Sequence, residues 1–235
     1  MLKYVVFLPL FIAYASFSQE RATPERLKHD KEICEAFAQK SIKEISGGFL
    51  LVRLNFRQKQ VDYLMKHDTV EAKKVQEKAL STNLKISKAF QDKYAFSRVY
   101  FFQSSDSRHL RNQVFDSVTF YDHDLNVVEA SELQKDNYLI GEFGRIQQDT
   151  ARYYASDRIY TPSNKEKTKV YYGGSKNGRE AFIVMDRKFQ QIQKPFPYFS
   201  PLQPFMSQKG RYRQALVVLD EKLGRYEREV NSTGK

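Results

Sequence analysis

The residue types best suited to binding chemistry gather in one short polar stretch, residues 103–111. The candidate binding residues in this stretch are Ser105, Asp106, Arg108, His109 and Arg111. Arginine binds carboxylate and phosphate groups through paired hydrogen bonds, so Arg108 and Arg111 predict a site for an anionic group. Residues 103–111 follow an apolar stretch, and Arg57 also follows one. We therefore include Arg57 in the candidate site.

The same stretch contains the residue types of a hydrolase. Ser105 or Ser107 as nucleophile, His109 as base and a nearby acid form the alternative hypothesis. The G-x-S-x-G motif of many serine hydrolases occurs nowhere in the chain. We therefore assign no catalytic residue. We expect a non-catalytic binding or interaction protein, with a secreted hydrolase that uses residues 104–111 as the alternative.

Two other motifs match ligand-binding loops only in part. Residues 173–178 have two glycines at phosphate-loop spacing, but Arg-Glu follows where Lys and Ser or Thr are required. Residues 122–126 match the first ligand positions of a calcium loop, but the later Gly and Glu are missing. The four histidines show no metal-binding spacing. The sequence thus predicts two turns at these motifs, and neither a metal nor a cofactor.

The elements expected around the site indicate how the fold would position it. Their predicted order is a helix at 22–46, a strand at 49–56, helices at 57–67 and 69–92, and a strand at 96–102. Strands joined by so long a helical connection run parallel. Arg57 and residues 103–111 would then leave the sheet at one edge, where open α/β sheets bind ligands.

After residue 110 the pattern changes to short strands and turns. Three stretches share one form: an apolar strand, Asp, two polar residues, Leu or Phe, and a turn residue. Their aspartates are Asp122, Asp186 and Asp220. Because Asp at the start of a turn accepts hydrogen bonds from the following backbone, we predict three antiparallel hairpins. The fold class is α/β or α+β: a mixed sheet with a parallel β-α-β start at 49–102, then antiparallel hairpins, preceded by an N-terminal helix.

The first residues have the layout of a secretory signal peptide. Lys3 precedes an apolar run that ends in the small residues Ser16 and Ser18. The run is shorter than the ~20 residues that span a bilayer as a helix. We therefore expect a signal peptide at 1–18 and an exported protein, periplasmic or secreted, without a membrane span in the mature chain. An uncleaved anchor is the alternative.

The rest of the chain is expected to fold as one unit. Residues 19–48 would form an N-terminal helix packed on a single α/β domain at 49–235. The chain has one cysteine, Cys34, so no intrachain disulfide can form. A loop with several prolines and aromatic residues, 194–205, is expected to cap the core. An exposed aromatic surface for a partner protein is the alternative interpretation of this loop.

The net charge narrows the class of partner. The chain of 235 residues has a formal charge of +11. A basic surface favours an anionic glycan, a lipid headgroup or an acidic protein as partner. Export would separate the protein from nucleic acid, so we do not expect a nucleic-acid partner.

Overall fold

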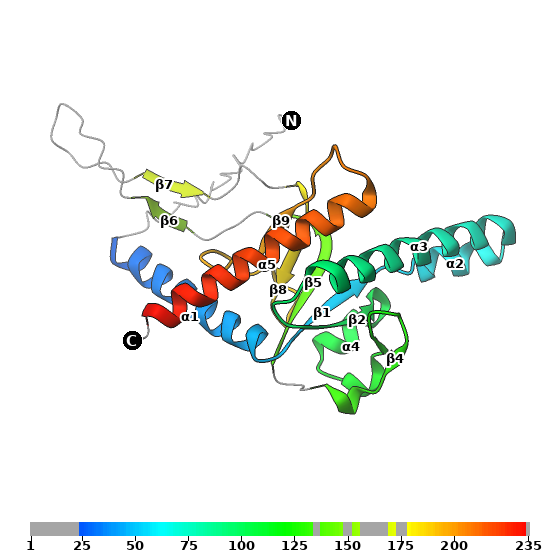
Figure 1. Ribbon diagram of the computed structural model, residues 1–235, viewed down its shortest axis with the longest axis horizontal. Helices are drawn as coiled ribbons and strands as arrows, with labels where there is room; N and C mark the ends of the chain where they lie inside the picture. Colours follow the sequence, from blue (N-terminus) through cyan, green and yellow to red (C-terminus); the bar gives the residue numbers. More distant parts are fainter. Residues whose placement is uncertain (1–23, 134–136, 148–151, 156–168, 173–177, 234–235) are drawn as a thin grey trace, which may run out of the picture.

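A seven-stranded mixed sheet forms the centre of the molecule (Figure 1). The structure is a computed structural model that describes residues 24–133, 137–147, 152–155, 169–172 and 178–233. The strand order is β4-β3-β2-β1-β5-β8-β9. The strands are β1 (Phe49–Leu54), β2 (Arg98–Gln103), β3 (Phe120–Tyr121), β4 (Val127–Val128), β5 (Tyr138–Arg145), β8 (Glu180–Met185) and β9 (Phe199–Pro201). The short strands β6 (Arg152–Ala155) and β7 (Lys169–Tyr172) pair separately.

The centre of the sheet is parallel. Strand β1 runs parallel to both β2 and β5, and the other pairs in the sheet are antiparallel. The parallel β-α-β start at 49–102 and the mixed α/β class are therefore confirmed. The connection from β1 to β2 runs through α2 (Gln58–Met65) and α3 (Thr69–Lys93), which is long enough to return the chain to the same end of the sheet.

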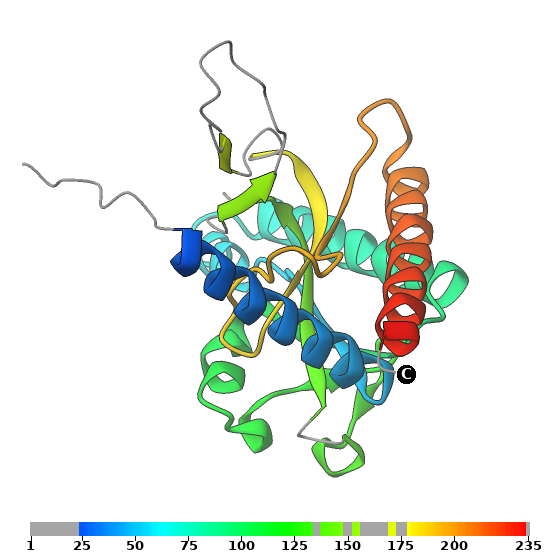
Figure 2. The ribbon, with the colours of Figure 1, turned by 90° about the vertical axis from the view of Figure 1, so that its left-hand side faces the viewer.

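Strand β1 is apolar at nearly every position because elements cover both faces of the sheet. In register, Val52 pairs with Phe101, and the Phe101 ring lies 5.7 Å from the ring of Phe90 on α3. The C-terminal helix α5 (Gln208–Thr233) packs beside α3, and its Tyr212 contacts Phe143 of β5 at 4.6 Å. Figure 2 shows these two helices together on one side of the sheet.

The opposite face is covered by short segments. Phe115, in a short 3-10 turn at Phe115–Ser117, packs edge-on against Tyr138 of β5 at 5.6 Å.

The N-terminal helix α1 (Pro24–Ser46) contacts β5, β1 and α5. Its residues Ala38, Ile42 and Ile45 are fully buried, so α1 is an integral part of the core.

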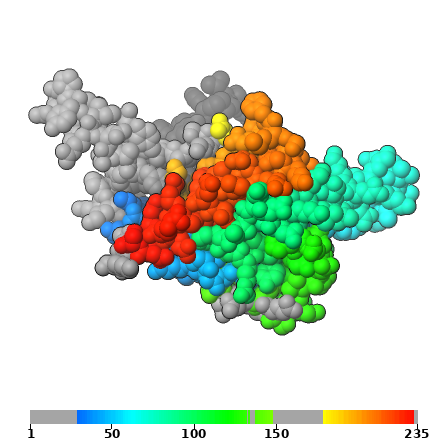
Figure 3. Space-filling model, viewed as in Figure 1, coloured from blue at the N-terminus to red at the C-terminus, as the bar shows by residue number. Residues whose placement is uncertain are grey.

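Residues next to the helix ends account for where α1 ends and where α3 begins. Helix α1 spans Pro24–Ser46 and ends before Gly47-Gly48. The Asp68 carboxylate caps α3 by accepting hydrogen bonds from the backbone N–H groups of Val70 and Glu71. Helix α2 and the first half of α3 project beyond the sheet (Figure 1) and form a protruding arm on the molecular surface (Figure 3).

Two of the three predicted hairpin turns are confirmed, and they share one geometry. Asp122 accepts hydrogen bonds from the backbone N–H groups of residues 124 and 126, and Asp186 does the same two and four residues on. The fourth turn residue is left-handed in both, with φ of 61° at Leu125 and 63° at Phe189. The Asp122 carboxylate is therefore occupied by its own turn. These hydrogen bonds outweigh partial desolvation and lower the pKa of Asp122.

The third predicted hairpin, around Asp220, is wrong. This segment lies within α5, and its buried residues follow helical spacing: Tyr212, Ala215, Leu216, Leu219 and Leu223. Strong helix formers surround Asp220, and the spacing places one continuous apolar face on the sheet. The Asp220 carboxylate accepts hydrogen bonds from the backbone of Ala95 and Phe96 instead, at 2.7 and 2.8 Å.

The proline-rich loop mainly closes the core, as expected. Phe196, Tyr198 and Phe199 are buried, whereas Phe205 is 99% exposed. The loop therefore presents a single exposed aromatic ring rather than a broad aromatic surface. The predicted signal peptide at 1–18 and most of the glycine-containing loop at 173–178 lie outside the described residues.

Candidate functional site

The predicted site residues leave the sheet at one edge. Leu54 and Gln103, the last residues of β1 and β2, are direct partners in the parallel register. Arg57 follows β1, and a 3-10 turn, η1 (Ser104–Asp106), followed by the short helix α4 (Ser107–Arg111), continues from β2. We call this the carboxyl edge, because both parallel strands end there.

Asp106 has a structural role at this edge. One carboxylate oxygen accepts a hydrogen bond from the Ser105 hydroxyl at 3.0 Å. The other accepts from the backbone N–H of Thr119 at 3.2 Å, which ties η1 to the segment that leads into β3. With both oxygens engaged, Asp106 holds the loop in place.

The serines do not pair with His109. Ser107 donates to the backbone carbonyl of Ser104 at 2.7 Å, and Ser105 bonds to Asp106. The His109 side chain is exposed, and no hydrogen bond among the described residues joins it to a serine or an acid. A nucleophile–base contact of the kind a serine hydrolase uses is therefore missing from this arrangement.

Arg111 belongs to a cationic cluster that the sequence did not indicate. Its guanidinium carbon lies 5.2 Å from the centre of the Phe189 ring, and that of Arg53 lies 5.9 Å from the same ring. The cluster thus joins α4, the turn after β8 and strand β1. Two guanidinium groups around one aromatic ring concentrate positive charge where a carboxylate or phosphate can be gripped.

The two arginines of this cluster differ in their partners. Arg53 forms an ion pair with Glu142 of β5 at 2.9 Å, and both side chains are about one-third exposed or less. Its Nε atom is buried without a hydrogen-bond partner. The Arg111 side chain is exposed and forms no ion pair among the described residues. Arg111 is therefore the group of the cluster that is open to a ligand.

The other predicted arginines stand apart. Arg57 is exposed in the left-handed conformation with φ of 55°, and its backbone N–H donates to the Asn55 side chain. Within the described residues neither Arg57 nor Arg108 has a side-chain hydrogen bond or ion pair. The structure thus joins Ser105 with Asp106, and Arg111 with Arg53 and Phe189, but it does not link Arg57 to either group.

Sequence reasoning missed Arg53, Glu142 and Phe189 because each lies in a different element. A weak signal was present: Arg53 is the one charged residue in an otherwise apolar strand. Such a residue faces either a partner or the solvent. Its partner, 89 positions along the chain, could be located only once the pairing of β1 with β5 was known.

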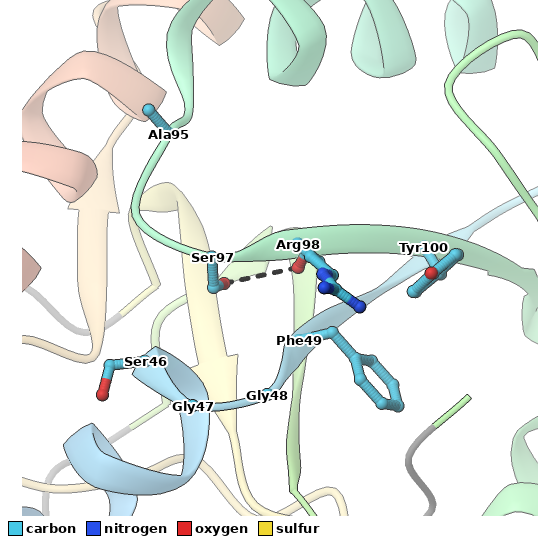
Figure 4. Close-up of a pocket in the computed structure, with 8 residues that line it drawn as sticks. All are labelled: Ser46, Gly47, Gly48, Phe49, Ala95, Ser97, Arg98 and Tyr100. Atoms are coloured by element: carbon cyan, nitrogen blue, oxygen red, sulfur yellow. Dashed lines mark hydrogen bonds between the residues drawn. The ribbon is translucent and has the colours of Figure 1, made fainter. Parts of the chain in front are cut away.

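A cavity of about 370 Å³ lies at the opposite, amino edge of the same strands. Its lining residues come from the end of α1, the start of β1 and the segment that enters β2: Ser46, Gly47, Gly48, Phe49, Ala95, Ser97, Arg98 and Tyr100. Figure 4 shows the side chains of Phe49, Arg98 and Tyr100 next to one another. We call this cavity the amino-edge hollow. Its volume falls in the range of small-molecule sites, about 300–1,000 Å³.

Aromatic packing forms the base of the hollow. Phe49 contacts Tyr100 edge-on at 5.5 Å and stacks on Tyr138 at 5.7 Å. Burial raises the pKa of the Tyr138 phenol, although the nearby Arg187 guanidinium opposes this. Two further hollows, of about 600 and 250 Å³, lie along the surface of α1.

The described residues contain no cluster of three or more His, Cys, Asp or Glu side chains that would hold a metal ion. In the same part of the chain, no helix combines the length and apolarity needed to cross a membrane.

No family model, curated protein or solved structure matches the chain. The functional assignment therefore depends on the site geometry.

Proposed function

We propose that the protein is an exported, non-catalytic binding protein that takes an anionic group at the carboxyl edge of its sheet. The observation that supports this most directly is the exposed Arg111 guanidinium, which lies over the Phe189 ring beside Arg53 and forms no ion pair among the described residues. Contact with the ring restricts the side chain of Arg111, so less conformational entropy is lost when the guanidinium binds an oxyanion.

The partner would be an anionic glycan, a lipid headgroup or an acidic protein. A formal charge of +11 attracts any of these over a distance comparable to the Debye length. Export is proposed from the apolar leader at residues 1–18. These partners all present an array of carboxylate, sulfate or phosphate groups. The experiment below compares a glycan with a lipid surface as the source of these groups.

The test measures binding of the purified protein at low salt to two probes: a fluorescent heparin oligosaccharide and vesicles that contain phosphatidylglycerol. We expect binding to one probe and a loss of about tenfold or more in Arg111→Gln, because a charge-assisted hydrogen bond contributes about 1.5–3 kcal/mol. Arg225→Gln is the matched control, since Arg225 lies on the exposed side of α5 and pairs only loosely with Glu229 at 3.9 Å.

Two outcomes would overturn the proposal. The first is an absence of binding to both probes at low salt. The second is equal weakening by the Arg111 and Arg225 substitutions, which would show a diffuse effect of net charge rather than a site.

A further inference from the structure

We propose that the amino-edge hollow is a second binding site, which takes a small hydroxylated carboxylate of the sugar-acid class. This site lies at the opposite end of β1 and β2 from the Arg111 cluster and shares no residue with it. The inference is therefore independent of the function proposed above.

Arg98 supplies the anion-binding group. It is exposed at the mouth of the hollow, and it forms no ion pair among the described residues. Arg98 is the first residue of β2, and its side chain lies between those of Phe49 and Tyr100 (Figure 4). A guanidinium with a fork of free N–H groups is suited to a carboxylate, which it binds through two parallel hydrogen bonds.

The aromatic wall fits a ring of limited apolar area. Tyr100 is half-buried and Phe49 is 2% exposed, so only Tyr100 and the edge of Phe49 reach the hollow. The Tyr100 hydroxyl has no hydrogen-bond partner among the described residues and is available to a ligand. One amphipathic ring beside an arginine matches a sugar ring that carries an acid group better than it matches a fully aromatic ligand.

The remaining walls are polar. Ser46 and Ser97 line the hollow with hydroxyls that already donate to the carbonyls of Lys43 and Arg98, and Gly47 and Gly48 add backbone at the end of α1. The last carbonyl groups of a helix form its negative end, which attracts hydrogen-bond donors, although the carbonyls of Lys43 and Ile45 already accept from the N–H groups of Gly47 and Gly48. A ligand with hydroxyl donors on one side and a carboxylate on the other would satisfy both the helix end and Arg98.

The walls are held in place by the rest of the fold. The Asp220 carboxylate on α5 accepts hydrogen bonds from the backbone N–H groups of Ala95 and Phe96. On the other side, the Phe49 N–H donates to the carbonyl of Asn137 at 3.1 Å. A preformed site loses less free energy to ordering when it binds a small ligand.

The test is an NMR titration of the full chain, labelled with ¹⁵N, with D-glucuronate as the probe. We expect saturable shifts at the amides of Gly47, Gly48 and Ser97, with a dissociation constant of about 1–10 mM for so small a ligand. Glucose, which has the hydroxyls without the acid group, and benzoate, which has the acid group without the hydroxyls, are titrated separately. Both should bind at least about fivefold more weakly.

Two variants assign the binding to individual groups. Arg98→Gln should weaken glucuronate about tenfold or more, and Tyr100→Phe, which keeps the ring, should weaken it severalfold. Arg225→Gln is the control and should leave the affinity unchanged. Because Arg98 and Arg225 are both exposed, neither substitution should disturb folding.

The proposal is overturned if glucuronate causes no saturable shift at these amides, or if Arg98→Gln binds it as tightly as the wild type does. Equal affinity for glucose would exclude a role for the acid group. Equal affinity for benzoate would exclude the sugar acid as the ligand class.

Discussion

The two edges of the parallel strands β1 and β2 are built differently. At the carboxyl edge, Arg111 and Arg53 lie around the half-buried ring of Phe189, and the Arg111 side chain is exposed. At the amino edge, one arginine stands beside a cavity with a volume of about 370 Å³. One edge is suited to an extended polyanion, and the other to a single small molecule.

This difference shows that the general rule for α/β folds predicts at which edge of the sheet a ligand binds, but it does not predict where a cavity forms. Ligands of open α/β sheets are expected at the carboxyl ends of the strands. In this protein α4 and the turn that carries Phe189 occupy that region, and the Phe189 ring packs edge-on against Phe102 of β2. The end of α1 and the loop before β2 leave the hollow at the other edge.

The largest expected effect comes from a glycine at the amino edge. A Cβ atom at Gly48 would lie 1.8 Å from the backbone oxygen of Asn137 and 2.7 Å from that of Glu44. Because backbone atoms cannot move aside cheaply, we expect Gly48→Ala to lower the free energy of unfolding by about 2 kcal/mol or more. Urea denaturation followed by circular dichroism measures this loss.

The matched substitution at the other end of the strands is Gly144→Ala. There a Cβ atom would meet only the carboxylate of Glu142, at 3.2 Å, and this side chain can shift. We expect a change below about 1 kcal/mol. A cost at Gly144 equal to that at Gly48 would contradict the idea that the close backbone approach at Gly48 causes the loss of stability.

A pair of aspartates provides the next comparison. Asp220 accepts two backbone hydrogen bonds at the wall of the amino-edge hollow, whereas Asp106 accepts one at the carboxyl edge. Asp220→Ala should cost about 1–3 kcal/mol of unfolding free energy, and Asp106→Ala about 1 kcal/mol. Thermal and urea unfolding of the two variants would reveal the order, and a reversed order would refute it.

The smallest effect is expected at alkaline pH. Burial raises the pKa of the Tyr94 phenol, and the Asp220 charge adds to this, although the Ser97 hydrogen bond opposes it. The stabilisation is thus fully present below the unfolded-state pKa of about 10 and is lost as the pH rises above it, because the unfolded chain ionises first. Tyr94→Phe should therefore lose stability less steeply than the wild type above about pH 10.

Urea midpoints at several pH values from neutral to alkaline provide this measurement. Tyr138→Phe serves as a comparison, since burial also raises the pKa of Tyr138. If the wild type and Tyr94→Phe lose stability equally with rising pH, Tyr94 is not sealed from water, and the adjoining wall of the hollow is looser than its hydrogen bonds indicate.

Local patterns predicted much of the fold. The strand that begins at Phe49 and the turns at Asp122 and Asp186 depend on neighbours within a few residues, and all three are confirmed. The segment at Asp220 shares the turn pattern but continues as a helix. Over only a few residues, its apolar pattern is compatible with either a strand or a helix. The segment is helical because the whole of α5 packs its apolar face against the sheet.

The candidate sites were less predictable than the fold. The sequence identified Arg111 as a candidate and the carboxyl edge as its place, because the order of strands and helices determines where loops emerge. It did not indicate Arg53, Phe189 or the amino-edge hollow. These depend on the pairing of β1 with β5, on a left-handed turn residue and on where α1 ends.

The amino-acid sequence by itself determined the mixed α/β class, the parallel start of the sheet, the basic charge and the turn chemistry. Each of these follows from composition or from interactions between residues close in the chain. Only the tertiary structure decided which arginine meets an aromatic ring, which edge of the sheet is hollow, and that Asp220 supports a distant loop from within a helix. The Arg111–Phe189, Ala95–Asp220 and Arg53–Phe189 contacts join residues 78, 125 and 136 positions apart. Such contacts depend on how complete elements pack rather than on any local pattern.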